Sequence, residues 1–297
     1  MGLDLTGTGV WSAGLRRAPD RGAAADAAAE LESLGYTALW MPGGDARTAF
    51  DAAGDLLRAT RSVTVATGIL SIWDGDPQWV AAERGELHDA YDGRFLLGLG
   101  VSHAPLVDRE EPGRYRRPLA AMRAYLDSLD AAAPAVPAEG RVLAALGPKM
   151  LRLARERSLG THPYLVTAEH TRIAREAVGP EKLVAPELGV VLSRDASRAR
   201  GIGREFVERY LALPNYANNL RRLGFDDADL ASGGSDRLVD ALIAWGSEDA
   251  IAARVQEHRD AGADQVLVQV LSGASDPSAL PLEEWRALAP ALTGAGG

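Results

Sequence analysis

Residues 38–67, ALWMPGGDARTAFDAAGDLLRATRSVTVAT, contain a strand, a helix and a second strand in succession, and this unit decides the fold. Ala38–Met41 is a short apolar run that predicts a buried strand, and Ser62–Thr67 is a β-branched run that predicts another. Between them, Thr48–Ala59 has an Ala- and Leu-rich helical pattern. Strands that alternate with helices in this way are typical of a parallel sheet in an α/β protein.

The same rhythm continues on both sides of this unit. Before it, Gly7–Trp11 is an apolar run, and a helical stretch from Asp20 ends at the stop signal Leu34-Gly35. After it, Pro77 begins a helix that runs to about Tyr91. The eight strands that we expect are Gly7–Trp11, Ala38–Met41, Ser62–Thr67, Phe95–Leu99, Val142–Leu146, Tyr164–Val166, Leu183–Leu192 and Gln265–Val270. Eight such strands with helices between them predict a (β/α)8 TIM barrel.

The spacing between successive predicted strands is irregular at one place only. The segment between the seventh and eighth strands is longer than one crossover helix requires, and it predicts a helical insertion at about residues 193–247, before the last strand. The Pro- and Ala-rich segment 134–140 is a connector, because the strand–helix rhythm resumes directly after it. We therefore expect residues 1–297 to form a single domain.

The composition narrows the functional classes. With no Cys among 297 residues, the chain cannot form a disulfide, a Cys-based zinc site, an iron–sulfur cluster or a thiol nucleophile. The net charge of −9 repels polyanions, which argues against nucleic acid as a partner. We find no signal peptide and no apolar segment of membrane-spanning length, so we expect a cytoplasmic protein that does not bind membranes.

Aromatic residues gather where the first three strands end. Trp11, Trp40 and Trp73 stand at or just beyond those ends. The reactive groups of a barrel lie at the C-terminal ends of its strands, so three tryptophans there predict the apolar walls of a pocket for a flat organic ring. The alternative interpretation is that Trp40 and Trp11 only cap the core.

Two loops after strands carry polar groups. The stretch Leu146-Gly147-Pro148-Lys149 turns at Gly and begins a helix with Pro in its first turn, which predicts a phosphate site at the helix start or, alternatively, a simple turn. It has neither the spacing of a P-loop nor a G-x-G-x-x-G pattern. The other loop, Gly98–Pro105, holds Gly100, Ser102 and His103 after the fourth strand.

His103 is our candidate acid or base, because imidazole titrates near neutral pH and Gly100 allows a ligand to approach the backbone. A histidine that only binds the cofactor is the alternative, and His162 at the sixth strand is the reserve candidate. We predict no metal site, because the sequence has no H-E-x-x-H or H-x-H motif, and nothing resembles the G-x-S-x-G of serine hydrolases. Redox chemistry would therefore need an organic cofactor.

Five stretches together resemble the bacterial-luciferase-like superfamily and, within it, the actinobacterial oxidoreductases that depend on the deazaflavin coenzyme F420. They lie between residues 37 and 171 and read TALWMPGG, VTVATGILSIWDGDP, GRFLLGLGVSHAPLVD, YRRPLAAMRAYLDSLD and LAALGPKMLRLARERSLGTHPYLVTAEHT. The resemblance implies a barrel with an insertion before its last strand, a flavin-type ring at the strand ends, a small-molecule substrate and a homodimer.

The resemblance also implies roles for individual residues. The family commonly has a non-prolyl cis peptide in the bulge that ends strand three, and the matching residues are Gly68 and Ile69. His103 lies where some relatives have an acidic proton donor. The cofactor-binding residues that we expect are Trp40, Gly68, Ile69, Gly100, Ser102, Leu146, Gly147, Pro148 and Lys149.

One departure limits the substrate. Sugar-phosphate-oxidising relatives have an Asp-His pair after strand two, where this chain has Met41-Pro42-Gly43-Gly44. We therefore expect hydride transfer between F420 and a small organic molecule other than a sugar phosphate. The alternatives are a monooxygenase of the same fold that uses FMN, and a barrel that binds a flavin-like ligand without turnover.

Overall fold

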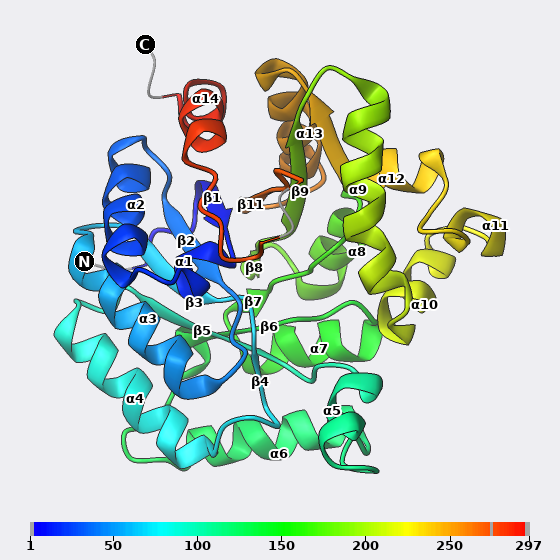
Figure 1. Ribbon diagram of the computed structural model, residues 1–297. Helices are drawn as coiled ribbons and strands as arrows, with labels where there is room; N and C mark the ends of the chain where they lie inside the picture. The colour runs from blue at the N-terminus through cyan, green and yellow to red at the C-terminus, as the bar shows by residue number, and fades with distance from the viewer. Residues whose placement is uncertain (1–2, 274–275, 295–297) are drawn as a thin grey trace.

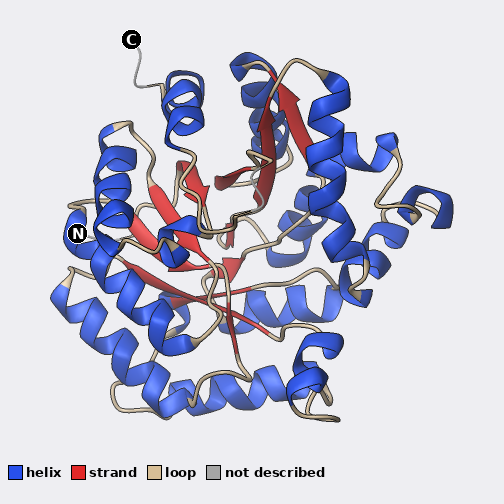
Figure 2. Ribbon diagram, viewed as in Figure 1, coloured by secondary structure: helices blue, strands red, loops and turns tan. Residues whose placement is uncertain are grey.

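The computed structural model describes residues 3–273 and 276–294. Its sheet curls round on itself, every strand pairing in it is parallel, and helices cover the outside (Figure 1). Figure 2 shows the strands as an inner layer within a ring of helices. This arrangement is the TIM-barrel-like α/β fold that the sequence predicts.

The sheet runs in the spatial order β10-β9-β11-β1-β2-β3-β5-β6-β7-β8, with β4 beside β5. The strands are β1 (Gly7–Trp11), β2 (Ala38–Met41), β3 (Thr64–Thr67), β4 (Leu70–Ser71), β5 (Phe95–Gly100), β6 (Arg141–Leu143), β7 (Gly160–Thr161), β8 (Leu183–Val184), β9 (Glu187–Leu192), β10 (Ile243–Gly246) and β11 (Gln265–Val270).

Two residues between β8 and β9 connect the two ends of the sheet and close the barrel. β8 and β9 lie far apart in the sheet order but are separated in the chain only by Ala185 and Pro186. The backbone N–H of Ala185 donates to the carbonyl of Thr161, at 3.0 Å, beside β7. The carbonyl of Pro186 accepts from the N–H of Leu267 in β11, at 2.9 Å. This segment is therefore hydrogen-bonded to both neighbours and joins the two sides of the sheet.

Polar side chains cap many of the helices. Asp45 accepts from the backbone N–H of Thr48, and Ser247 accepts from that of Ala250, so each satisfies a donor that a helix start leaves free. The helices are α1 (Gly14–Arg17), α2 (Arg21–Ser33), α3 (Ala46–Ala59), α4 (Pro77–Ala90), α5 (Ala104–Glu110), α6 (Pro118–Asp130), α7 (Pro148–Arg157), α8 (Ala168–Val178), α9 (Ala196–Leu211), α10 (Pro214–Arg222), α11 (Asp227–Leu230), α12 (Asp236–Leu242), α13 (Glu248–Asp260) and α14 (Leu282–Thr293).

Strand alternation divides the core into two layers. Leu39 and Met41 of β2 belong to the large cluster between sheet and helices, which also contains Phe50 of α3. Trp40 belongs instead to a cluster of inward-facing residues inside the barrel, with Trp11. Because successive side chains of a strand point to opposite layers, Trp40 lies within the barrel although it is one residue from the end of its strand.

Two strand predictions are corrected by the structure. The sixth strand is not Tyr164–Val166 but β7, two residues earlier in Gly160–Thr161. The preceding Pro163 has no N–H to donate to a ladder, and Leu165 has a left-handed backbone with φ 54°. The seventh run, Leu183–Leu192, is interrupted at residues 185–186 and forms β8 and β9.

The segment between β9 and β11 leaves the barrel and returns to it. It forms α9 to α12, which lie together on one side in Figure 1 and have an apolar cluster of their own that includes Phe206 and Leu220. The predicted insertion at about residues 193–247 is helical except for its last part. There β10 pairs with β9, from Ile243 opposite Gly189 onward, and this strand was not expected.

Candidate functional site

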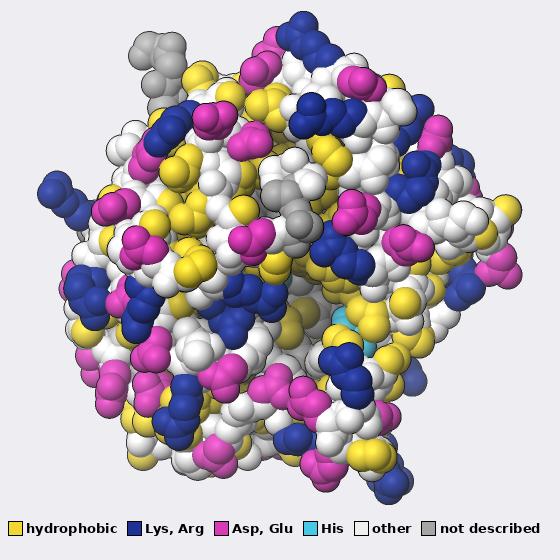
Figure 3. All heavy atoms as spheres, in the orientation of Figure 1, with side chains coloured by type: hydrophobic (Ala, Val, Ile, Leu, Met, Phe, Trp, Pro, Cys, Tyr) yellow, Lys and Arg dark blue, Asp and Glu magenta, His cyan; other side chains and the backbone are white. Residues whose placement is uncertain are grey.

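A cavity of about 900 Å³ opens at the end of the barrel where the strands terminate. This is within the range of small-molecule and cofactor pockets. Its walls come from the ends of β1, β5 and β11, from the loops after β3, β6 and β7, and from α9 and α10. Figure 3 shows the hollow on this face, with basic side chains near its rim. Within the described ranges no helix is long and apolar enough to cross a membrane, and no group of His, Asp and Glu is arranged to hold a metal.

The bulge after β3 forms part of the pocket floor. The peptide bond between Gly68 and Ile69 is cis, as the family resemblance implies, and both residues line the cavity. The indole N–H of Trp11 donates to the carbonyl of Gly68 at 3.1 Å. A Cβ on Gly100 would lie 2.3 Å from Cδ1 of Ile69, so a side chain at residue 100 would displace the isoleucine from its present position.

His103 faces the cavity from the loop after β5. Its imidazole packs on the ring of Tyr216, with centroids 4.9 Å apart, and its Nδ1 is buried without a hydrogen-bond partner among the described residues. Ser102 before it has φ 55°, and its carbonyl accepts from the side-chain amide of Asn215 in α10, at 3.3 Å. Burial lowers the pKa of His103 to about 4. The side chain is therefore a neutral imidazole at neutral pH. An unperturbed histidine would be partly protonated at that pH and could act as an acid.

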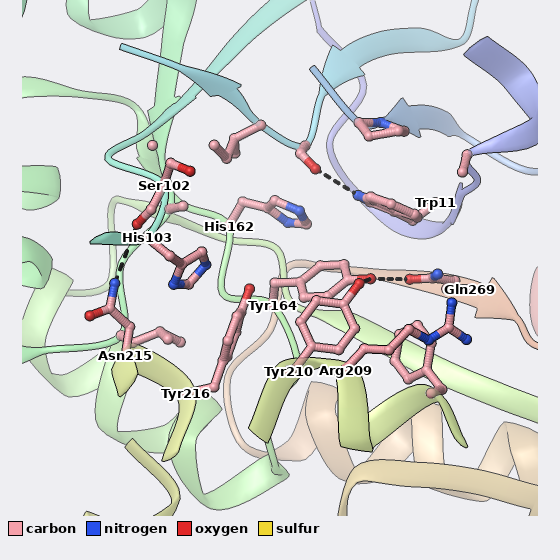
Figure 4. Close-up of a pocket in the computed structure, with 18 of the residues that line it drawn as sticks. Trp11, Ser102, His103, His162, Tyr164, Arg209, Tyr210, Asn215, Tyr216 and Gln269 are labelled. Atoms are coloured by element: carbon pink, nitrogen blue, oxygen red, sulfur yellow. Dashed lines mark hydrogen bonds between the residues drawn. The ribbon is translucent and has the colours of Figure 1, made fainter. Parts of the chain in front are cut away.

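His162, the reserve candidate, lies in the floor beside the bulge (Figure 4). Its Nδ1 is 2.7 Å from the carbonyl oxygen of Ala185, and its ring packs against Trp40 with centroids 4.4 Å apart. Its Nε2 is buried with no partner among the described residues. Complete burial lowers the pKa of His162 to about 4, so this ring is also neutral.

The loop after β6 forms the basic end of the pocket. Leu146, Gly147, Pro148 and Lys149 all line the cavity, as predicted for a phosphate site. Gly147 precedes α7 and provides no side-chain cap, so the positive end of that helix is open toward a ligand. The nearest atom to a Cβ built on Gly147 is Nη2 of Arg222 in α10, at 3.9 Å. Arg222 brings a second cation to the loop, and the sequence analysis did not predict it.

Tyrosines form the wall opposite the floor. The hydroxyl of Tyr164 donates to Oε1 of Gln269 at 2.7 Å and lies 2.9 Å from the hydroxyl of Tyr210. The one proton of Tyr164 is used for Gln269, so Tyr210 is the donor in the second bond. Burial raises the pKa of Tyr210 to about 12 and holds that of Tyr216 well above its usual value, so these phenols stay neutral. Figure 4 shows the three rings facing the cavity, with Arg209 beside them.

Below the tyrosines, Glu187 at the start of β9 is almost completely buried. Its Oε2 accepts from the backbone N–H of Leu165 at 3.0 Å, and its Oε1 has no partner among the described residues. Burial raises the pKa of Glu187 to about 8, because the hydrogen bond from Leu165 offsets only part of the desolvation. A protonated carboxyl therefore lies under the aromatic wall at neutral pH.

The prediction that three tryptophans line the mouth of the pocket is wrong for two of them. Trp11 lines the cavity, but Trp40 lies beneath the floor, fully buried, with its indole N–H donating to Oε1 of Gln265 at 3.3 Å. Trp73 is not part of the lining and donates to the carbonyl of Val101. Trp40 therefore supports the floor through His162 and does not face a ligand.

The structure brings the other predicted residues together. Gly68, Ile69, Gly100, Ser102, His103 and the Leu146–Lys149 loop all face one cavity, although they come from three separate strand ends. The tyrosine wall was missed because two of its members lie in the insertion, whose position over the barrel mouth no local pattern reveals. Gln269 did have a signal, since it is a polar residue near the C-terminal end of the closing strand, after the apolar run Val266–Val268.

Comparisons with known proteins agree with this geometry. The model of a family described as luciferase-like monooxygenase matches residues 5–265. A 5,10-methylenetetrahydromethanopterin reductase of Methanolobus tindarius is 24% identical over 300 residues, which cover 84% of this chain and 91% of that protein.

Two solved structures illustrate the shared fold. The coenzyme F420 dependent tetrahydromethanopterin reductase from Methanopyrus kandleri superposes with a TM-score of 0.73 at 15% identity, covering 98% of both chains. The oxygenating constituent of 3,6-diketocamphane monooxygenase from Pseudomonas putida, in complex with FMN, has a TM-score of 0.69 at 14% identity, covering 97% of this chain and 98% of that one.

Proposed function

The chain belongs to the luciferase-like monooxygenase family, and from this premise we propose that it is an oxidoreductase that transfers a hydride between coenzyme F420 and a small organic substrate. The cofactor class, deazaflavin or flavin, is supported by the related structures, of which one is an F420-dependent reductase and another holds FMN. The observation that carries the proposal is the pocket itself. It combines a floor formed by the Gly68–Ile69 bulge with a basic end at the start of a helix.

The residues fit such a cofactor at both ends. Gly147 leaves space that a side chain would fill, and Lys149 and Arg222 supply positive charge for a phosphate in a protein whose net charge is −9. Gly68 and Gly100 carry no Cβ, which lets Trp11, His162 and Ile69 pack closely beside the floor on which a ring would lie. These residues would hold the phosphate and the ring respectively.

The protein's chemical contribution is centred on His103. When bound, the cofactor supplies the group that accepts or gives up the hydride. His103 is neutral at neutral pH and therefore in the form that accepts a proton. A neutral imidazole could receive a proton from a substrate hydroxyl in one direction of the reaction and return it in the other. The apolar faces of Trp11 and Tyr164 exclude water from the reacting atoms.

A binding titration of the purified protein with F420 and with FMN, followed by cofactor absorbance and fluorescence, tests the proposal. We expect F420 to bind more tightly than FMN. Tighter binding of FMN would support the monooxygenase alternative. Tight binding of F420, with neither reduction of F420 by any of a panel of alcohols nor oxidation of reduced F420 by the corresponding carbonyl compounds, would support a barrel that only binds the ligand.

A further inference from the structure

A buried histidine from α8 holds the backbone of the Leu146–Lys149 loop. His170 lies in the first turn of α8 and is 1% exposed. Its Nε2 is 3.1 Å from the carbonyl oxygen of Leu146. A carbonyl can only accept, so Nε2 carries the hydrogen, and burial, which lowers the pKa of His170, keeps the imidazole neutral. The carbonyl of Leu146 is therefore held toward α8.

This hydrogen bond also sets the direction of the next N–H along the chain. The Leu146–Gly147 peptide bond is trans, and in a trans peptide the N–H points opposite to the carbonyl. Because the carbonyl is turned to His170, the N–H of Gly147 points away from α8. It has no acceptor among the described residues, and Gly147 is only half-buried and lines the cavity. The backbone thus offers a donor to a ligand at the start of α7.

Glycine at this position makes the orientation of the peptide easy to lose. A peptide flips by rotation about ψ of the residue before it and φ of the residue after it. Gly147 has φ −96°, and glycine accepts the positive φ that a flip would produce. The flipped peptide would turn the oxygen of Leu146 toward the ligand in place of the N–H, and an oxygen repels a phosphate. The hydrogen bond from His170 opposes the flip, because the flip would break it.

We propose that His170 is a positioning residue of the phosphate site, and that it fixes the Leu146–Gly147 peptide so that its N–H donates to the phosphate. This inference rests on the proposed function, which assigns the cofactor's phosphate to this loop. His170 does not line the cavity, so it acts on the ligand only through the loop. Hydrogen bonds to an anion are about twice as strong as neutral ones. Loss of this donor should therefore weaken the binding of the phosphate and not that of the ring.

The test measures what the phosphate adds to binding, as the ratio of the dissociation constants of riboflavin and FMN, and likewise of the phosphate-free ribityl deazaflavin and F420. In His170→Phe, which keeps a ring but has no donor, this ratio should fall by about tenfold. His170→Gln should stay within about threefold of wild type, because its side-chain amide can still donate to Leu146. His258→Phe is the matched control and should keep the wild-type ratio, because His258 is equally buried but its Nδ1 contacts Thr171 and not the loop.

A second measurement uses wild-type protein only. With 13C at the leucine carbonyls and 15N at the glycines, the amide proton of Gly147 should move downfield when FMN or F420 is added, but not with the phosphate-free forms. Equal ratios in wild type and folded His170→Phe, or a Gly147 amide that responds alike to both forms, would overturn the inference while leaving the proposed function standing. If neither F420 nor FMN binds to wild-type protein, both proposals fail.

Discussion

Glu187 makes the stability of the folded protein fall as the pH rises through neutrality. Burial raises its pKa from the ordinary value of about 4.5 to about 8 in the folded state. Between these two values the unfolded chain has lost the proton and the folded chain keeps it, so the native state binds more protons. By linkage, the stability that Glu187 contributes is greatest below about pH 4.5 and is lost progressively up to about pH 8.

The alkaline half of this window isolates Glu187 from the buried histidines. The pKa values of His103, His162 and His258 are lowered to about 4, so their stability is present above the unfolded value of 6.5 and is lost only as the pH falls below it. Near pH 8 they are neutral in both states, and the protons that the unfolded histidines still hold at lower pH affect wild type and a Glu187 variant equally. At about 1.4 kcal/mol per unit, flattening near pH 8, Glu187 should lower the free energy of unfolding by about 1.5–2 kcal/mol from pH 6.5 to pH 8.

Glu187→Gln provides the comparison. The glutamine is uncharged at every pH, and its side-chain oxygen can still accept from the backbone N–H of Leu165. Urea unfolding at pH 6.5, 7.0, 7.5 and 8.0 should show the difference between wild type and variant change by about 1.5–2 kcal/mol, whatever constant cost the substitution has. Exposed Glu181→Gln is the control and should follow the wild-type curve. Parallel curves for wild type and Glu187→Gln would refute the reasoning.

Three further predictions concern the pocket. His103→Ala, assayed at saturating cofactor and substrate, should lower turnover by about 10²–10⁴-fold, and lost cofactor affinity with retained turnover would make it a binding residue. Gly147→Val should weaken cofactor binding about tenfold or more without loss of stability, because its Cβ meets no backbone; an unchanged dissociation constant contradicts the phosphate assignment. Gly98→Ala should destabilise the fold by about 3 kcal/mol or more, since its Cβ would lie 1.8 Å from the carbonyl oxygen of Thr67. Gly100→Ala should destabilise it less, because the new Cβ meets only side-chain atoms. Equal denaturation midpoints for the two variants would contradict this contrast.

Local patterns predicted the parts of the site that follow strands directly. The Gly98–His103 loop and the Leu146–Lys149 turn were located because a buried parallel strand is a continuous apolar run, and the residue types change sharply where it ends. The cis peptide at Gly68 came from the family resemblance, since no composition or period encodes it. The resemblance therefore supplied what the residue pattern alone did not.

The other features depend on contacts between distant segments. Trp40 was expected in the pocket wall, but the alternation of side chains along β2 turns it into the barrel, where it packs on His162, the residue after β7. β10 was missed because Ile243–Gly246 follows a helix without a turn signal, and its partner β9 is about 50 residues earlier. Tyr210 reaches the pocket only because α9 packs over the mouth. Sequence patterns describe local conformation and burial, but not which surface a long insertion covers.

The separate apolar cluster of α9 to α12 has an evolutionary consequence. Phe206, Leu220 and their neighbours support this segment largely without the residues of the barrel interior, yet the same segment presents Arg209, Tyr210 and Tyr216 to the cavity. The floor and the basic loop, in contrast, belong to the barrel. Mutations in α9, and in α10 at positions other than Arg222, can thus remodel one wall while the proposed ring and phosphate contacts are inherited unchanged. Descendants of such a barrel can acquire new substrates by altering this one segment, and libraries for directed evolution are best confined to it.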